Sequence, residues 1–359
     1  MNARRVGMLL VAAILVIVLA VWLSSRKVRI AENAAGTPVM KALKAQLNDV
    51  TEVRISKGDG SRATLRKQPT GWIVGEREYP ADTTKVRKLL IDLSSLDTVE
   101  AKTSDPGKYA QLGVEDVNTP TAAGTRVEAV TAQQVHGIII GKTSGAKSGY
   151  VRAMDAKQSV LATPMIQADA DPKHWLDATL FDIPEARVKE IEVAVPSGPA
   201  YKVAREKKEQ TDFTVTGVPK GRELSSPTAA NGYGSALVLL ALTDVKKDDA
   251  TPITQPPRVT FRTFDGLELQ ITGRLDGDHR LVSIVPRSTA KETADEVQKL
   301  EARVKGWWFE IPNYKYDALF RPLEEMLKAL EKKADTKAPA AKKIGTKPAE
   351  PALPSSPAN

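Results

Sequence analysis

The longest apolar stretch of the chain runs from Val6 to Leu23 and contains no charged side chain. Its 18 residues would span about 27 Å as an α-helix, close to the thickness of a bilayer's hydrocarbon core. A cleaved signal peptide has a shorter apolar region followed by a small-residue cleavage site, and a buried helix of a soluble protein has a polar face. The stretch has neither feature, so it predicts a retained transmembrane anchor over residues 6–23.

Beyond residue 50 the apolar positions follow the two periods of β-strands and helices. Alternation over 53–67 around Gly58-Asp59-Gly60 predicts a β-hairpin, and 71–74 predicts a third strand. Asp82 can then cap a helix, because the apolar residues after it recur at helical spacing. These residues are Val86, Leu89, Leu90, Leu93 and Leu96. Further strands are expected at 126–131, 135–141, 150–154 and 159–162.

The same order of elements returns in the second half of the chain. Strands are expected at 188–195, 201–205, 212–215, 259–261, 267–273 and 281–285, with a helix at 235–242. The strand end at Gly141 matches the one at Gly273 at an offset of 132, and Val127 matches Val259 at the same offset. A repeat of this length is a domain rather than a solenoid element, because each copy can bury its own core.

We therefore expect an α+β fold in which two tandem, internally duplicated domains follow a transmembrane helix. Each domain would be an antiparallel β-meander with one main helix packed on its sheet. The C-terminal segment is dominated by Lys, Ala and Pro and is expected to be disordered. The expected segments are a short cytoplasmic N-terminus (1–5), the anchor (6–23), a stalk (24–50), the first repeat (51–185), the second repeat (186–330) and the tail (331–359).

The formal net charge of +8 comes from the two ends of the chain. Residues 1–29 carry five basic and no acidic side chains, and residues 331–359 carry six lysines and three acidic residues. The intervening body is therefore electrically balanced, which argues against a nucleic-acid-binding surface. Because the chain has no cysteine, thiolate catalysis and zinc–cysteine sites are excluded.

Several segments of the first copy resemble a bacterial family of unknown function. They include Gly-Trp-Ile-Val at 71–74, Tyr-Pro-Ala-Asp at 79–82, Lys-Tyr-Ala-Gln-Leu-Gly-Val at 108–114 and Gly-Tyr-Val-Arg at 149–152. The chain resembles the domain-of-unknown-function family 4340 over about residues 50–320, although Phe213 replaces the tryptophan in the second copy. The resemblance implies a membrane-anchored protein found beside gliding-motility-type ABC transporter permeases and auxiliary proteins, and it supplies no catalytic residues.

Motifs that could carry chemistry are incomplete. Gly141-Lys142 resembles the end of a phosphate-binding loop, but that motif needs a glycine five residues before the Gly-Lys pair and a helix after it. The three histidines, His136, His174 and His279, have no neighbours at metal-binding spacing. We therefore expect no catalytic, cofactor-binding or metal-binding residues, and no cofactor.

The densest aromatic group of the body is Trp307, Trp308 and Phe309. One interpretation is a strand whose rings fill the second core. The other is an exposed patch that binds a partner protein or a glycan. On the second interpretation these three residues are the candidate partner-binding site.

The sequence favours a non-enzymatic accessory or scaffold protein with membrane-protein partners in an ABC-type export system. A short tail, one apolar helix and a large body predict a single-pass protein of the bacterial inner membrane with its body in the periplasm. Counting basic residues does not decide the orientation, because they flank the apolar stretch on both sides. The alternatives are an envelope glycan- or lipid-binding module and, third, an envelope hydrolase.

Overall fold

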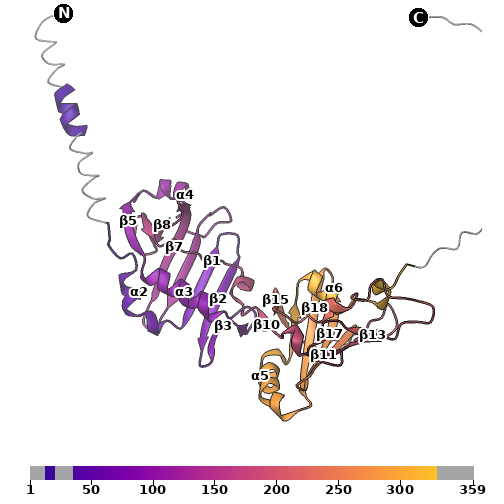
Figure 1. Ribbon diagram of the computed structural model, residues 1–359. Helices are drawn as coiled ribbons and strands as arrows, with labels where there is room; N and C mark the ends of the chain where they lie inside the picture. Colours follow the sequence, from indigo (N-terminus) through magenta and orange to yellow (C-terminus); the bar gives the residue numbers. More distant parts are fainter. Residues whose placement is uncertain (1–12, 21–34, 330–359) are drawn as a thin grey trace, which may run out of the picture.

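The computed structural model describes residues 13–20 and 35–329 (Figure 1). Residues 13–20 form a helix with exposed side chains. The rest of the expected anchor lies outside the described residues, as do the expected N-terminus and tail. Within the described part of the chain, no helix is both long and apolar enough to cross a bilayer.

Two antiparallel sheets form the body (Figure 1). The first sheet contains β1 (Glu52–Lys57), β2 (Arg62–Gln68), β3 (Gly71–Val74), β4 (Tyr79–Pro80), β5 (Asp97–Ala101), β6 (Thr125–Val130), β7 (Val135–Ser144), β8 (Ser148–Ala153) and β9 (Val160–Thr163). The second contains β11 (Val188–Ala194), β12 (Tyr201–Ala204), β13 (Thr214–Thr216), β15 (Asp244–Lys247), β16 (Arg258–Thr263), β17 (Leu267–Asp276), β18 (His279–Ser288) and β19 (Trp307–Glu310). A separate pair joins β10 (Thr179–Phe181) to β14 (Leu240–Ala241).

The two sheets share one strand order. The first runs β4-β3-β2-β1-β6-β7-β8-β9-β5, and the second runs β13-β12-β11-β16-β17-β18-β19-β15, without a counterpart of β4. In each sheet, two hairpins are joined by antiparallel pairing between strands that are distant in the sequence. In the first sheet β1 pairs with β6, for example Ile55 with Val127, and in the second β11 pairs with β16, for example Val193 with Val259. The predicted α+β class with antiparallel sheets is confirmed, and the strand order recurs as the repeated sequence pattern predicts.

The main helix of the first half, α3 (Thr83–Ser94), forms for the reasons that its sequence gives. The Asp82 carboxylate accepts hydrogen bonds from the backbone N–H groups of Thr84 and Lys85 at 2.9 and 3.2 Å. The apolar stripe of α3 is buried against the first sheet, across which the helix runs in Figure 1. Each fully buried Val or Leu of this stripe contributes about 1.5–3 kcal/mol.

Other helices are shorter or appear in the second half only. They are α2 (Lys41–Ala45), α4 (Tyr109–Leu112), α5 (Ala294–Val304) and α6 (Asn313–Leu319), with 3-10 turns η1 (Leu47–Asp49), η2 (Pro106–Lys108), η3 (Pro172–Trp175), η4 (Glu185–Arg187), η5 (Asn231–Tyr233), η6 (Lys291–Thr293) and η7 (Leu323–Met326).

The helix expected at 235–242 does not form. This segment consists of turns followed by β14, and Leu239 has a left-handed φ of 47°. An apolar run this short gains little from helix formation on its own, so pairing with β10 decides its conformation. The long helix of the second half is instead α5, between β18 and β19, so the two halves differ in where their helix is inserted.

The expected stalk is corrected in part, because residues 36–50 belong to the first domain. The Gly36 N–H donates to the Thr98 carbonyl oxygen at 2.7 Å, which adds this segment to the edge strand β5. Met40, Leu43 and Val50 are buried in the core. Burial of these apolar side chains outweighs the cost of ordering the segment, whereas a free stalk would leave them in water.

Candidate functional site

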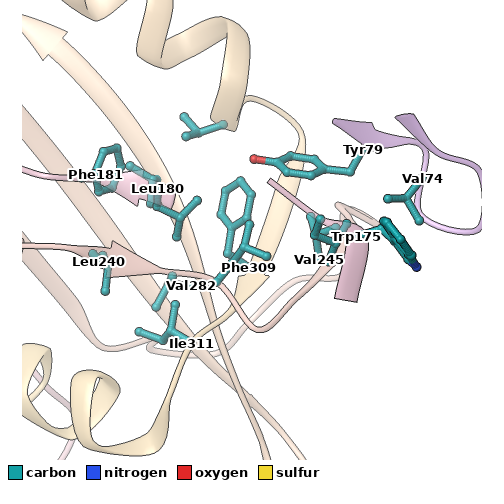
Figure 2. Close-up of a cluster of buried hydrophobic side chains, with 14 of the residues drawn as sticks. Val74, Tyr79, Trp175, Leu180, Phe181, Leu240, Val245, Val282, Phe309 and Ile311 are labelled. Atoms are coloured by element: carbon teal, nitrogen blue, oxygen red, sulfur yellow. The ribbon is translucent and has the colours of Figure 1, made fainter. Parts of the chain in front are cut away.

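The junction between the two halves is built around Tyr79 of β4. Its side chain leaves the first sheet, is fully buried, and contacts two aromatic rings of β19, of which Figure 2 labels Phe309. The ring centroids of Tyr79 and Trp307 are 5.3 Å apart, and those of Tyr79 and Phe309 are 5.9 Å apart, both edge-to-face. Such pairs contribute about 0.5–1.5 kcal/mol each beyond the area they bury. Tyr79 therefore joins two sheets that are far apart in the sequence.

Apolar residues from both halves surround this contact and form one continuous core. Figure 2 shows residues of the first half and of the second half converging on the same cluster. Those labelled are Val74, Tyr79, Trp175, Leu180, Phe181, Leu240, Val245, Val282, Phe309 and Ile311. A shared core makes the relative placement of the halves part of the fold, because separating them would expose all of this surface to water.

Charged side chains cross the junction beside the core. The Arg77 guanidinium donates two hydrogen bonds to the Asp244 carboxylate, at 2.7 and 3.1 Å, and the Lys173 ammonium lies 3.2 Å from the same group. Burial raises the pKa of Asp244, but the hydrogen bonds from Arg77 and from a backbone N–H outweigh it and hold the pKa below its usual value of 3.8. Asp244 is therefore ionised at neutral pH and is satisfied by two cations of the first half.

Two further ion pairs and one unsatisfied hydroxyl complete the junction. Asp177 lies 2.9 Å from Arg303 of α5, and Glu78 contacts Lys247 of β15. The Tyr79 hydroxyl is buried and makes no hydrogen bond to any described residue. Burial raises the pKa of the Tyr79 phenol, and the Arg303 guanidinium, which lies beside the hydroxyl outside hydrogen-bond geometry, offsets part of this rise as a neighbouring donor and as a positive charge. The phenol therefore contributes to the junction through its ring rather than through its oxygen.

The aromatic group predicted as a partner site forms β19 at this junction. Phe309 is fully buried and Trp308 is 6% exposed. The Trp308 indole N–H donates to Asp248 Oδ1 at 3.0 Å, while Trp307 is half-buried against Tyr79. The structure thus turns two of the three side chains inward and leaves an edge of Trp307 accessible. Use of this group by a partner stays a prediction.

The other residues singled out in the sequence do not come together. His136 lies beside Gln46 and Gln134, His174 beside Asp169, and His279 beside Glu310. Among residues 13–20 and 35–329, no group of three or more His, Asp or Glu side chains could hold a metal ion. Gly141 lies within β7, where a Cβ would come within 2.3 Å of the Leu112 carbonyl oxygen, so its role is to admit the close approach of α4.

Sequence reasoning missed two depressions on the first domain. One, of about 490 Å³, lies over the polar face of β1, β2 and β6. Around Ser56 it is lined by four arginines and three glutamates: Arg54, Arg62, Arg66, Arg126, Glu52, Glu76 and Glu128. The other, of about 550 Å³, shares Arg54 with it and is lined in part by apolar side chains. The sequence does show that these arginines occupy the polar positions of strands with alternating apolar and polar residues. It does not show that they lie next to one another, which follows only from the register of neighbouring strands.

Fold and junction together define an α+β protein with two antiparallel sheets that share one core. The chain belongs to the family described as "Domain of unknown function (DUF4340)", whose profile matches residues 72–256. The matched segment runs from β3 across the junction to the loop before β16, so it contains both Tyr79 and Asp244. The predicted family membership is confirmed. Searches of the curated proteins and of the solved structures found no match to this chain.

Proposed function

We propose that this protein is a non-enzymatic, membrane-anchored scaffold or accessory subunit of an ABC-type export system. Residues 6–23 would span the bacterial inner membrane once, and the body would face the periplasm. The two halves would be copies of one ancestral unit, now used as a single body. Its function would be to hold membrane-protein partners at a fixed spacing rather than to transform a substrate.

The observation that carries this proposal is the junction. Tyr79 in the second core and the Arg77–Asp244 pair bind the halves in one arrangement. Two sheets held this way present their outer faces at a constant distance and angle, which a scaffold requires and which a pair of flexibly linked domains would not provide. The support for an anchor is the uncharged stretch from Val6 to Leu23.

Affinity purification in the bacterium that encodes the protein tests the proposed partners. The full chain with a C-terminal tag is extracted from membranes with a mild detergent, and the bound proteins are identified by mass spectrometry. We expect enrichment of ABC transporter permease or auxiliary subunits. A Tyr79→Ala variant should stay in the membrane but retain less of these subunits, whereas Tyr314→Ala, which changes a tyrosine that is 69% exposed, should retain them as the unchanged chain does.

Recovery of none of these subunits, although they are present in the extract, would contradict the export role. A topology reporter fused after residue 330 tests the orientation separately. An alkaline phosphatase fusion should be active, because that enzyme needs the periplasm to form its disulfides. An inactive fusion, or a mature chain that begins after Leu23 and washes off the membrane, would contradict the anchored arrangement.

The second candidate function is a binding module for envelope lipid. The observation that favours it is the pair of adjoining depressions on the first domain, one lined by arginines and one lined in part by apolar side chains. The glycan form of this alternative has no comparable support, because Trp308 and Phe309 are turned inward.

A further inference from the structure

Three arginines converge on the face of the first sheet that points away from α3. In the register of the sheet, Ser56 on β1 lies opposite Arg62 on β2 and opposite Arg126 on β6. Arg54, two residues before Ser56 on the same strand, therefore points to the same face. Their neighbours Val53 and Ile55 are buried on the other face. Three guanidinium groups thus surround one small hydroxyl side chain across three adjacent strands.

These guanidinium groups have hydrogen-bond donors to spare. Arg126 donates through Nε to Ser56 Oγ at 3.2 Å, and its closest carboxylate, that of Glu128, is 3.9 Å away. Arg54 uses its Nε on Glu52. The Arg62 backbone pairs with β1, but its guanidinium makes no hydrogen bond or ion pair with residues 35–329. The terminal NH₂ groups of all three are therefore open to a ligand, and such planar pairs of donors suit the oxygens of a phosphate.

The second half keeps the arginine at the position of Arg126 but not the one at the position of Arg54. When Val127 is matched to Val259, the strand register places Glu192 at the position of Arg54, whereas Arg258 stands at the position of Arg126. On that sheet the main arginine, Arg262, is held by Glu190, Glu192 and Glu268 at 2.7, 3.3 and 2.9 Å. The same strand order is thus built in the second copy with a glutamate at the position of Arg54 and with Arg262 paired to three carboxylates.

A groove lined by both apolar and polar side chains continues from the arginines. The larger depression shares Arg54 and Glu128 with the arginine-lined one and extends to Val135 and Met154, which are 51% and 42% exposed. Gly137 lies opposite Glu128, and a Cβ there would come within 2.3 Å of Met154 Sδ. The missing side chain lets the flexible thioether lie across the strand and form an adaptable apolar surface.

We propose that this face of the first domain binds one anionic phospholipid. The phosphate would lie on Arg54, Arg62 and Arg126, and an acyl chain would follow the groove past Val135 and Met154. A ligand with an anionic head and an apolar tail matches the two adjoining surfaces, whereas free phosphate or a polar glycan would leave the groove empty. The proposal does not depend on an export partner.

The proposed anchor keeps this groove close to a lipid source. Val39, which lines the groove, follows Leu23 by 16 residues. A chain of that length reaches at most about 55 Å. The domain would therefore remain within a short distance of the bilayer surface whatever path the intervening residues take.

Native mass spectrometry of the full chain in a non-ionic detergent tests the site. The probes are dihexanoyl phosphatidylglycerol, dihexanoyl phosphatidylcholine and glycerol phosphate. We expect one phosphatidylglycerol to bind per chain, with an affinity at least tenfold higher than that for phosphatidylcholine or for glycerol phosphate. Equal binding of both lipids would overturn the role of the arginines, and equal binding of glycerol phosphate would overturn the role of the groove.

Variants assign the site to its residues. Arg54→Gln/Arg62→Gln/Arg126→Gln should weaken phosphatidylglycerol binding at least tenfold. The matched control on the second sheet, Lys202→Gln/Arg258→Gln/Arg287→Gln, removes the same charge and should leave binding unchanged. Equal loss in both triple variants would show attraction by net charge alone and would overturn the proposed site.

A groove variant separates head from tail recognition. Val135→Ser/Met154→Ser should weaken binding of phosphatidylglycerol but not of glycerol phosphate, since both side chains line the groove and are about half exposed. Thermal unfolding of every variant checks that the fold is kept. A folded groove variant that binds phosphatidylglycerol as the unchanged chain does would contradict the acyl-chain path.

Discussion

Replacing Tyr79 by alanine removes the side chain through which the first sheet enters the second core. The ring is fully buried and makes edge-to-face contacts with Trp307 and Phe309. Truncation of a buried aromatic residue to alanine costs about 3–5 kcal/mol. Each lost aromatic pair accounts for about 0.5–1.5 kcal/mol of this. Because a protein of this kind is stable by only about 5–15 kcal/mol, the change removes a large share of the total.

The hydroxyl of the same residue provides a contrasting test. Tyr79→Phe keeps the ring and removes an oxygen that makes no hydrogen bond to any described residue. Removing an unsatisfied buried hydroxyl relieves a desolvation cost. We therefore expect Tyr79→Phe to change the free energy of unfolding by less than about 1 kcal/mol, or to increase it.

Denaturant unfolding of the full chain in detergent, followed by tryptophan fluorescence and circular dichroism, measures both effects. The unchanged chain should unfold in one transition, because its halves share a core, whereas Tyr79→Ala should give two transitions with the first at lower denaturant. Tyr314→Ala, at a position that is 69% exposed, is the control and should shift the free energy of unfolding by less than about 0.5 kcal/mol. A single, unshifted transition in Tyr79→Ala would refute the shared core.

Three further outcomes follow from the same structure. The pKa of Asp244 is lowered in the folded protein. The ionised carboxylate therefore contributes its full stabilisation above pH 3.8, and this is lost as the pH falls through the pKa of the folded state. Asp244→Asn should accordingly flatten the acid limb of a plot of unfolding free energy against pH. Gly141→Ala should destabilise by about 1–3 kcal/mol in thermal unfolding, because its Cβ would meet a backbone carbonyl, whereas Gly198→Ala, at a position with open space, should be nearly neutral. Burial raises the pKa of Tyr233 and of Tyr316 to about 12, so ultraviolet titration should show phenols that ionise well above pH 10. The stability that these two side chains contribute should be lost as the pH rises from 10 towards 12. Complete titration near pH 10 without unfolding would contradict their burial.

Local patterns in the sequence predicted most strands and the helix α3. Alternation placed β1 and β2, and Asp82 marked the start of α3 because its side chain can satisfy the first N–H groups. These elements depend on neighbours within a few residues. The helix α5 was missed because only Val297, Leu300 and Val304 mark its apolar side, among many charged residues. Its position is decided by packing on β18, which the local sequence does not show.

The functional features depend on contacts between distant residues. Tyr79 was noted only within the Tyr-Pro-Ala-Asp segment at 79–82, although its ring contacts residues 307 and 309 in the other half of the chain. The arginine face could not be recognised until the register placed Arg62 and Arg126 on either side of Ser56. A repeat in the sequence predicts that two similar sheets form, but it carries no information on which side chains cross between them.

The fixed arrangement of the two halves is the central claim, and a distance measurement tests it directly. The chain contains no cysteine, so Arg87→Cys on α3 and Lys299→Cys on α5 create two unique, exposed sites for spin labels. Double electron–electron resonance on the full chain should give one narrow distance distribution, which broadens when Tyr79→Ala is added. A broad distribution in the chain that retains Tyr79 would contradict a rigid junction and, with it, the proposed scaffold.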